Sequence, residues 1–209
     1  MRIAWRIGLA LTLALFASFT VALAAPAPKT AASIYKENIG RVVTIQGDML
    51  GTGFVLASGL LVTNAHVVGN ASLVQVETQD GQSYKAEVVK KDISQDFAIL
   101  QFDRATIKPF FNLIPIQHAG TPEIGEGVVI IGSPLGLRGT ATTGIVSQVY
   151  PNGLIQLNAS VNPGNSGGPV FDMQGRVFGI ATLKVQQTPD GKSVDGLGIA
   201  IPIGWLDAY

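Results

Sequence analysis

From about residue 41 to residue 205, the chain alternates between short apolar runs and interrupting Gly, Asn, Asp or Pro residues. The apolar runs are rich in β-branched residues, which is typical of strands. The pattern predicts a first set of six strands at Val42–Gln46, Gly53–Leu56, Leu60–Thr63, Leu73–Glu77, Ser83–Lys90 and Ala98–Phe102. It predicts a second set of six at Gly127–Ile131, Thr140–Tyr150, Leu154–Asn158, Pro169–Asp172, Val177–Leu183 and Leu197–Ile201.

The two sets are separated by the stretch from Asp103 to Glu126, whose prolines indicate a crossing connection. Before the first strand, Ala31 to Ile39 carries apolar residues at helical spacing and predicts one short helix. Regularly spaced strands with few amphipathic helices favour a sandwich or a barrel over alternating strand–helix units. The pattern therefore predicts an all-β protein in two halves.

The N-terminal residues follow a different pattern. Arg2 and Arg6 precede an uncharged apolar run from Ile7 to Ala25, and Ala22-Leu23-Ala24 has the small-x-small pattern of a signal peptidase site. We expect residues 1–24 to be an export signal, and residues 25–40 to be a linker with the short helix. The apolar run is also just long enough to span a bilayer, so an uncleaved membrane anchor stays open. Both alternatives place the rest of the chain outside the cytoplasm, in the periplasm or secreted.

Composition then narrows the chemistry. Lys and Arg number 14, and so do Asp and Glu, so no basic surface is expected to bind nucleic acid. The chain has no cysteine, which excludes disulfides, thiolate metal sites and a cysteine nucleophile. His66 and His118 are the two histidines, which excludes a multi-histidine metal site. We expect no metal and no cofactor, and any reaction that needs an imidazole must use one of these two residues.

Two of the predicted strands have a polar residue at one end. His66 follows the strand ending at Thr63, and Asp96 precedes the strand starting at Ala98. Taken alone, His66 is compatible with a hydrogen-bonded core histidine, and Asp96 with a turn residue at the start of a strand. A buried carboxylate nevertheless needs a partner, because burying it alone is costly.

The segment Asn162-Pro163-Gly164-Asn165-Ser166-Gly167-Gly168-Pro169 is the third candidate. Glycines around Ser166 permit a tight turn that exposes the hydroxyl and lets a substrate approach the main chain. The amides from Gly164 to Ser166 could point the same way and form an oxyanion pocket. A simple glycine-rich surface turn is the alternative, but it does not explain a serine at this position.

Together these residues have the chemistry of a nucleophilic triad. A serine hydroxyl needs a neutral imidazole to take its proton, and the imidazole needs a carboxylate to fix its tautomer. The segment around Ser166 also fits the G-x-S-x-G elbow of α/β hydrolases, in which the histidine follows the serine. No histidine follows Ser166, whereas the order His66, Asp96, Ser166 is that of the two-barrel serine proteases.

From about Arg41 to Trp205, the sequence resembles the trypsin-like proteases of the HtrA/Deg group. The segments that carry the resemblance are Gly51-Thr52-Gly53-Phe54-Val55, Thr63-Asn64-Ala65-His66-Val67-Val68, Asp96-Phe97-Ala98-Ile99-Leu100, Ile131-Gly132-Ser133-Pro134-Leu135-Gly136, Gly144-Ile145-Val146-Ser147, the Ser166 segment, and Gly196-Leu197-Gly198-Ile199-Ala200-Ile201-Pro202. The resemblance implies a chymotrypsin-like pair of six-stranded antiparallel β-barrels with the triad between them. It implies a protease domain over residues 41–209, with barrel one at about 41–108 and barrel two at about 123–205.

The resemblance also implies the roles of the site residues. Ser166 would be the nucleophile, His66 the general base and Asp96 the acid that orients His66. The amides of Gly164 and Ser166 would form the oxyanion hole. Asn165 stands where digestive relatives have an aspartate that pairs with a new N-terminus, so activation by propeptide cleavage is not expected. Control is expected in the loops Ser133–Thr143 and Leu183–Gly196, and no PDZ domain is expected.

Substrate preference follows from position in the motif. Ser160 stands where trypsin has an acid at the floor of the specificity pocket, which argues against Arg or Lys as the selected residue. Val161, Leu183 and Ile199 are candidate walls of a pocket for small or medium aliphatic side chains, although Lys184 could favour an acidic residue instead. Thr182 is either a support for Asp96 or a plain strand threonine. His118 is expected on the surface.

The prediction is a serine endopeptidase that cuts unfolded or flexible polypeptides outside the cytoplasm, with a role in protein quality control. Its partners would be polypeptide substrates, not nucleic acid, and a membrane if the N-terminal segment is uncleaved. Whether copies of the chain form the trimer common among relatives stays open. The alternative is an HtrA-like chaperone or binding module with weak or no proteolysis.

Overall fold

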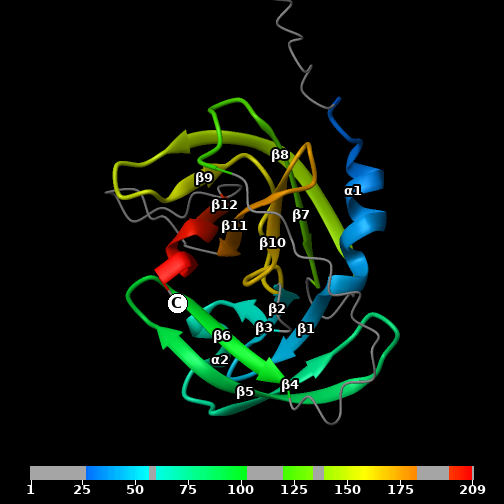
Figure 1. The fold of residues 1–209 in the computed structure, drawn as a ribbon, viewed down its shortest axis with the longest axis vertical. Helices are drawn as coiled ribbons and strands as arrows, with labels where there is room; N and C mark the ends of the chain where they lie inside the picture. Colours follow the sequence, from blue (N-terminus) through cyan, green and yellow to red (C-terminus); the bar gives the residue numbers. More distant parts are fainter. Residues whose placement is uncertain (1–26, 57–59, 103–119, 134–138, 183–197, 209) are drawn as a thin grey trace, which may run out of the picture.

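The structure, a computed structural model, describes residues 27–56, 60–102, 120–133, 139–182 and 198–208. In this part of the chain the strands form two closed barrels, one above the other in Figure 1. Barrel one consists of β1 (Val42–Gln46), β2 (Leu50–Val55), β3 (Leu60–Thr63), β4 (Leu73–Glu77), β5 (Ser83–Asp92) and β6 (Phe97–Phe102). Barrel two consists of β7 (Gly127–Gly132), β8 (Thr140–Val149), β9 (Ile155–Leu157), β10 (Pro169–Asp172), β11 (Val177–Thr182) and β12 (Gly198–Pro202). The predicted pair of six-stranded antiparallel barrels is confirmed.

The two barrels share one topology. Around barrel one the strands run β1-β2-β3-β6-β5-β4, and around barrel two β7-β8-β9-β12-β11-β10. Each strand of barrel one, β1 to β6, therefore occupies the same place in its barrel as the corresponding strand of barrel two, β7 to β12. The amino-acid sequence shows no corresponding internal repeat, so the two barrels reach the same arrangement with different side chains.

Strand positions agree with the sequence pattern, and their ends differ by a few residues. β1, β3, β4 and β10 have the predicted bounds. β2 begins at Leu50 rather than at the predicted Gly53, because Gly51 and Thr52 pair with Ile45 and Thr44 of β1. β5 continues to Asp92, past an irregularity between Val88 and Lys90 in its pairing with β6. These two strand ends could not be predicted from the pattern, because glycines and a bulge interrupt the alternation of apolar and polar residues.

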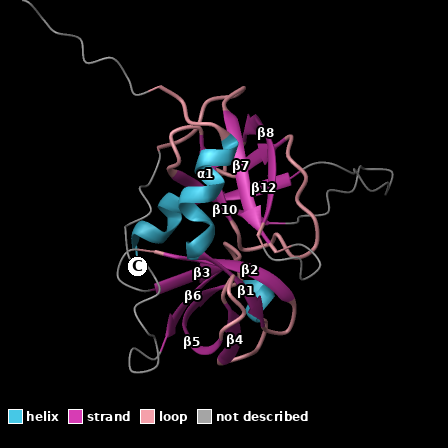
Figure 2. Cartoon of the chain, turned by 90° about the vertical axis from the view of Figure 1, so that its right-hand side faces the viewer, coloured by secondary structure: helices cyan, strands magenta, loops and turns pink. Residues whose placement is uncertain are grey.

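The predicted N-terminal helix is present as α1 (Ala31–Asn38), which lies beside barrel two in Figures 1 and 2. The Thr30 side chain caps it by accepting a hydrogen bond from the Ser33 amide, and Ile34 is buried beneath it. Three short helices among the described residues were not predicted: α2 (Ala65–Val68), η1 (Ile39–Arg41) and η4 (Ile203–Ala208). A single helical turn is too short to show a periodic pattern, which explains why they escaped prediction.

Within the described residues, three apolar clusters stabilise the barrels. One consists of barrel-one residues together with Val67 and Val68 of α2, and a second consists of barrel-two residues. The third combines both barrels with α1 and η4, and includes Ile34, Phe54, Phe97, Phe171 and Leu206. This shared cluster fixes the barrels against each other, because separating them would expose its large apolar side chains to water.

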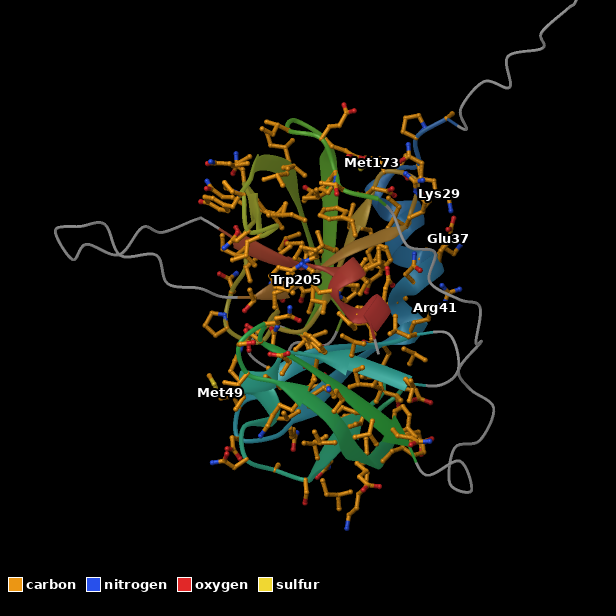
Figure 3. All side chains as sticks on the ribbon, turned by 60° about the vertical axis from the view of Figure 1, so that its left-hand side comes forward. Lys29, Glu37, Arg41, Met49, Met173 and Trp205 are labelled. Carbon is orange, nitrogen blue, oxygen red and sulfur yellow. The ribbon has the colours of Figure 1, made fainter. Side chains whose placement is uncertain are left out.

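Figure 3 shows how the N-terminal segment is held against barrel two. Lys29 lies near Glu37 of α1, with an ion pair of 2.5 Å, and its backbone amide donates to the carbonyl of Met173 at 2.6 Å. The Lys29 and Glu37 side chains are both exposed to water, so this ion pair adds little stability. The backbone bond and buried Ile34 therefore do most to hold the helix.

Several expectations concern parts of the chain outside the described residues. These are the export segment over residues 1–24, His118, Leu183, Lys184 and the loop Leu183–Gly196. Within the described residues, no helix is long and apolar enough to cross a membrane.

Candidate active site

The His66 side chain is presented by the single turn of α2, directly after β3. Val67 and Val68 are fully buried in barrel one, whereas the His66 side chain is 33% exposed. The two valines anchor the turn, and His66 faces the other way. Asn64 occupies the N-cap position but makes no side-chain capping bond to the helix.

Asp96 lies in the turn between β5 and β6 and has an unusual backbone conformation. Its φ of 59° makes it the non-glycine residue with positive φ in the described part of the chain. The Asn64 side-chain amide donates to the Asp96 carbonyl at 2.8 Å. Aspartate tolerates this region better than most residues, at a cost of about 1–2 kcal/mol. The Asn64 bond thus supports the strained turn at Asp96.

His66 and Asp96 form a close pair. His66 Nδ1 lies 3.0 Å from both Asp96 Oδ1 and Asp96 Oδ2, and the His66 backbone amide donates to Oδ1 at 3.1 Å. From barrel two, the Thr182 hydroxyl donates to Oδ2 at 3.0 Å. Burial raises the pKa of the Asp96 carboxyl, but the hydrogen bonds from His66 and Thr182 outweigh it and hold this pKa below its usual value. An ionised Asp96 keeps the proton of the imidazole on Nδ1 and leaves Nε2 free to accept one.

Ser166 lies in a turn of barrel two between Gly164 and Gly167, whose φ angles are +100° and +88°. At Gly167, a Cβ atom would lie 2.1 Å from the Thr52 carbonyl oxygen. The turn therefore requires glycine for both its conformation and its close contact with barrel one. Ser166 itself is 5% exposed.

Two amides of this turn have no partner within the described residues. The amide of Asn165 donates to the Asn162 carbonyl at 2.9 Å, Gly167 to Ala181 at 2.8 Å, and Gly168 to Asn165 at 2.9 Å. For the amides of Gly164 and Ser166 the described part of the chain offers no hydrogen-bond acceptor. Because a buried amide without an acceptor is costly, these two are available to an external oxyanion.

The described residues show no hydrogen bond between the His66 ring and the Ser166 hydroxyl. The structure therefore brings His66, Asp96 and Thr182 together in hydrogen-bond contact, and it brings Ser166 and the two amides to the same barrel boundary through Thr52. In enzyme structures without substrate, hydrogen bonds between reacting groups are often long and tighten only when substrate is bound.

The residues named for the specificity pocket lie on barrel two. Ser160 is exposed, and its carbonyl accepts a bond from the Thr142 hydroxyl at 3.1 Å. Val161 is 7% exposed, and a Cβ atom on Gly198 would lie 2.6 Å from its Cγ2. Ile199, next to Gly198, is buried and pairs with Thr182 across β11 and β12. Leu183 lies outside the described residues.

Sequence reasoning assigned no role to Thr52 or Asn64. Both stand in segments that carry the family resemblance, but Thr52 precedes the predicted strand Gly53–Leu56, and the helix after Asn64 was not predicted. Asn64 occupies the N-cap position of α2, yet its side chain bonds to the Asp96 carbonyl instead. The complete burial of Thr52 is known from the structure and has no signal in the local sequence.

Among the described residues, no group of three His, Cys, Asp or Glu side chains is placed to hold a metal ion. The site consists of one imidazole, one carboxylate, two hydroxyls and free main-chain amides.

Known proteins resemble this chain over most of its length. Residues 51–180 match the family described as the trypsin-like peptidase domain. The chain is 35% identical over 196 residues to the serine endoprotease DegS of Salmonella typhimurium, covering 88% of this chain and 53% of DegS. It is 39% identical over 165 residues to the periplasmic serine endoprotease DegP of the same species, covering 73% of this chain and 33% of DegP.

A solved structure agrees with these matches. The crystal structure of the serine endoprotease from Yersinia pestis superposes with a TM-score of 0.72 at 30% identity, over 88% of this chain and 66% of that chain. The chain spans a third to about half the length of DegP and DegS.

Proposed function

This chain belongs to the trypsin-like peptidase family as an HtrA/Deg-type protease domain, and from this premise we propose that it is a serine endopeptidase. The catalytic residues in this proposal are His66, Asp96 and Ser166. The observation that carries it is the His66–Asp96 pair, with both carboxylate oxygens 3.0 Å from Nδ1. This pair faces a barrel boundary at which a serine turn offers two free amides.

The first step is attack of Ser166 Oγ on the carbonyl carbon of the scissile peptide bond. His66 Nε2 takes the hydroxyl proton, and the carboxylate of Asp96 stabilises the imidazolium that forms. The new C–O bond shifts the carbonyl electron pair onto oxygen. The amides of Gly164 and Ser166 donate to this oxyanion, a kind of stabilisation that commonly contributes about 10²–10³ in kcat per donor.

The second step releases the amine product and then the acid product. His66 returns its proton to the leaving nitrogen as the C–N bond breaks, which leaves an ester between Ser166 and the substrate. A water molecule, deprotonated by His66, then attacks this acyl-enzyme, and the proton returns to Ser166 Oγ. The 33% exposure of His66 supports this role, since water must reach its ring.

The proposed substrates are unfolded or flexible polypeptides outside the cytoplasm. The relatives named above are serine endoproteases, and the name of DegP includes the word periplasmic. The export segment predicted over residues 1–24 agrees with this location. The proposed preference for small or medium aliphatic residues rests on the positions of Ser160, Val161 and Ile199 in the motif; Ser160 is exposed, and Val161 and Ile199 are buried.

The test is the loss of activity in Ser166→Ala. We expect this variant to fold and to leave casein uncut, while the native chain degrades casein and reacts with a fluorophosphonate at Ser166. Ser83→Ala is the matched control, because Ser83 lies in β5 and bonds to Gln75 away from the site. Casein degradation by Ser166→Ala equal to that of the native chain would overturn the proposal.

One observation favours the second candidate, an HtrA-like binding module with little turnover. His66 and Ser166 share no hydrogen bond within the described residues, as in a resting site. The fluorophosphonate separates the two functions. An enzyme is labelled at Ser166 in the presence of substrate, and a binding module is labelled under no condition of substrate or pH.

A further inference from the structure

Thr52 of β2 makes hydrogen bonds across the barrel boundary to both sides of the Ser166 turn. Its hydroxyl donates to the Gly164 carbonyl at 2.5 Å and accepts from the Ser133 amide at 2.9 Å. Its backbone amide donates to the Ser166 carbonyl at 2.8 Å. One fully buried residue of barrel one therefore bonds to the two residues whose amides are free.

The surroundings of Thr52 hold it in one position. Its carbonyl accepts a bond from the Thr63 hydroxyl at 2.7 Å, and its backbone pairs with Thr44 of β1. The missing side chain of Gly167 makes room for the Thr52 carbonyl, and a Cβ on Gly168 would lie 3.3 Å from the Thr52 methyl group. Thr52 is thus a fixed point against which the turn is placed.

The Gly164 carbonyl needs such a fixed point. Glycine rotates more freely than other residues, and Gly164 has a φ of +100°. Its own amide has no partner in the described part of the chain, so its carbonyl is the group that ties it down. Without the Thr52 hydroxyl, the buried Gly164 carbonyl and the buried Ser133 amide would both lose their hydrogen-bond partner. Because an unpaired buried polar group is costly, the Gly164 peptide would then rotate toward another partner.

We propose that Thr52 is a positioning residue, whose hydroxyl directs the amides of Gly164 and Ser166 toward the oxyanion. The inference rests on the proposed function, since an oxyanion forms only if Ser166 attacks a carbonyl. Barrel one thereby orients both partners of the reaction, the base through Asp96 and the oxyanion turn through Thr52.

The first test compares Thr52→Val with Thr52→Ser. Valine keeps the shape and removes the hydroxyl, and we expect kcat to fall about 10- to 100-fold with KM within about twofold, because small displacements at a reacting centre have effects of this size. Serine keeps the hydroxyl, and we expect kcat within about threefold of the native value. Equal losses in the two variants would assign the effect to the methyl group and overturn the proposal.

The second test uses a peptide aldehyde, which adds to Ser166 and places a tetrahedral oxygen in the oxyanion site. Thr52→Val should weaken aldehyde binding by about the factor lost in kcat/KM, while the matching peptide alcohol binds as before. Thr44→Val is the matched control, because the Thr44 hydroxyl is also buried and crosses to barrel two, where it donates to the Ser133 hydroxyl at 2.9 Å. Native aldehyde affinity in Thr52→Val would overturn the proposal.

The remaining measurement does not depend on activity. Hydrogen exchange of the amides from Asn162 to Gly168 should be faster in Thr52→Val than in the native chain and in Thr44→Val, and unchanged exchange would overturn the positioning role. If the native chain shows no Ser166-dependent hydrolysis, the proposed function fails. The exchange result would still show whether the Thr52 hydroxyl holds the Ser166 turn in place. If Thr52→Val does not fold, Thr52→Cys replaces it, since a thiol is a weaker donor; native exchange and kcat in that variant would contradict the proposal.

Discussion

The two barrels have the same strand order but hold their parts of the site by different means. Barrel one presents two side chains, His66 and Asp96, which are fixed by hydrogen bonds between side chains and to the backbone. Barrel two presents Ser166 and main-chain amides, in a turn whose conformation requires glycine at Gly164 and Gly167. An imidazole must be oriented in its plane, which takes directed bonds. A pocket made of main-chain amides needs a tight turn and close approach to the backbone, which glycines permit.

The same contrast holds for the aspartates. Asp96 of barrel one accepts bonds from the His66 ring and from Thr182. Asp172 of barrel two is 1% exposed and accepts from the amides of Gln174 and Arg176 and from the Arg176 guanidinium at 2.7 Å. Asp172 closes a hairpin, whereas Asp96 faces the base. The two carboxylates are both well hydrogen-bonded but differ in burial, with 17% of the Asp96 side chain exposed and 1% of that of Asp172, and they differ in the groups that donate to them.

The largest expected effect comes from Asp96→Asn. Asparagine adopts positive φ as readily as aspartate, so the turn should survive. Its amide cannot stabilise an imidazolium, and it favours the wrong tautomer of His66. We expect kcat to fall about 10³–10⁴-fold, the size known for this change in a serine protease triad, with KM little changed. Steady-state kinetics on a peptide substrate measure it.

Asp172→Asn is the control for this difference between the barrels. It should lower the free energy of unfolding, because the ion pair with Arg176 is lost, and leave kcat of the folded protein unchanged. If both substitutions reduce kcat by similar factors, the assignment of Asp96 to the reaction and of Asp172 to the fold is wrong.

Gly167→Ala tests the backbone side of the comparison. Its Cβ would meet the Thr52 carbonyl at 2.1 Å and the Thr63 hydroxyl at 2.3 Å, in a conformation that alanine rarely adopts. We expect a loss of about 2–5 kcal/mol in the free energy of unfolding, from the sum of positive-φ strain and overpacking. Urea unfolding measures it. Gly40→Ala is the control, since nothing lies within 4 Å of its Cβ, and it should be close to neutral.

Thr182→Val removes the bond that barrel two contributes to Asp96. Two of the three donors to this carboxylate, the ring and amide of His66, stay in place, so the effect should be modest. We expect a loss of up to about tenfold in kcat, the size that corresponds to the net contribution of one typical hydrogen bond, about 0.5–1.5 kcal/mol. Thr182→Ser should retain native kcat. A loss in Thr182→Ser as large as in Thr182→Val would point to the methyl group instead.

Most of the fold could be predicted from the sequence because alternation and turn residues mark strands directly. The pattern placed both sets of strands and separated them into two halves. It could not show that the halves share one strand order, since pairing is decided by contacts between distant residues. The turn of α2 also escaped prediction, although it carries His66, because four residues are too few for a helical pattern.

The candidate site divides in the same way. Chain order linked His66, Asp96 and Ser166, and these residues lie at one barrel boundary. The hydrogen bonds that place them could not be predicted, because each joins residues far apart in the chain. Thr52 is separated from Gly164 by 112 positions, and Asn64 from Asp96 by 32. No local pattern records such pairs.

The smallest expected effect is on the pH dependence of the free energy of unfolding, to which we expect Asp96 to contribute more than nearby carboxylates. Burial alone would raise the pKa of Asp96, but the bonds from His66 and Thr182 hold it below the usual 3.8. A carboxyl with a lower pKa in the folded than in the unfolded chain contributes stability above the unfolded value, and this contribution is lost as pH falls through the folded pKa. The unfolding free energy of the native chain should therefore fall more steeply below about pH 3.8 than that of Asp96→Asn.

Urea unfolding of both proteins between pH 6 and pH 2.5 measures this difference in slope. Asp92→Asn is the matched comparison in the same turn region, because the Ser94 hydroxyl and the Gln95 amide also lower the pKa of Asp92. Asp92 is partly exposed, so water and salt screen its interactions and its substitution should change the slope less. A native slope in Asp96→Asn would mean that folding does not lower the pKa of Asp96, so that the hydrogen bonds to this carboxylate orient His66 without favouring its ionised form.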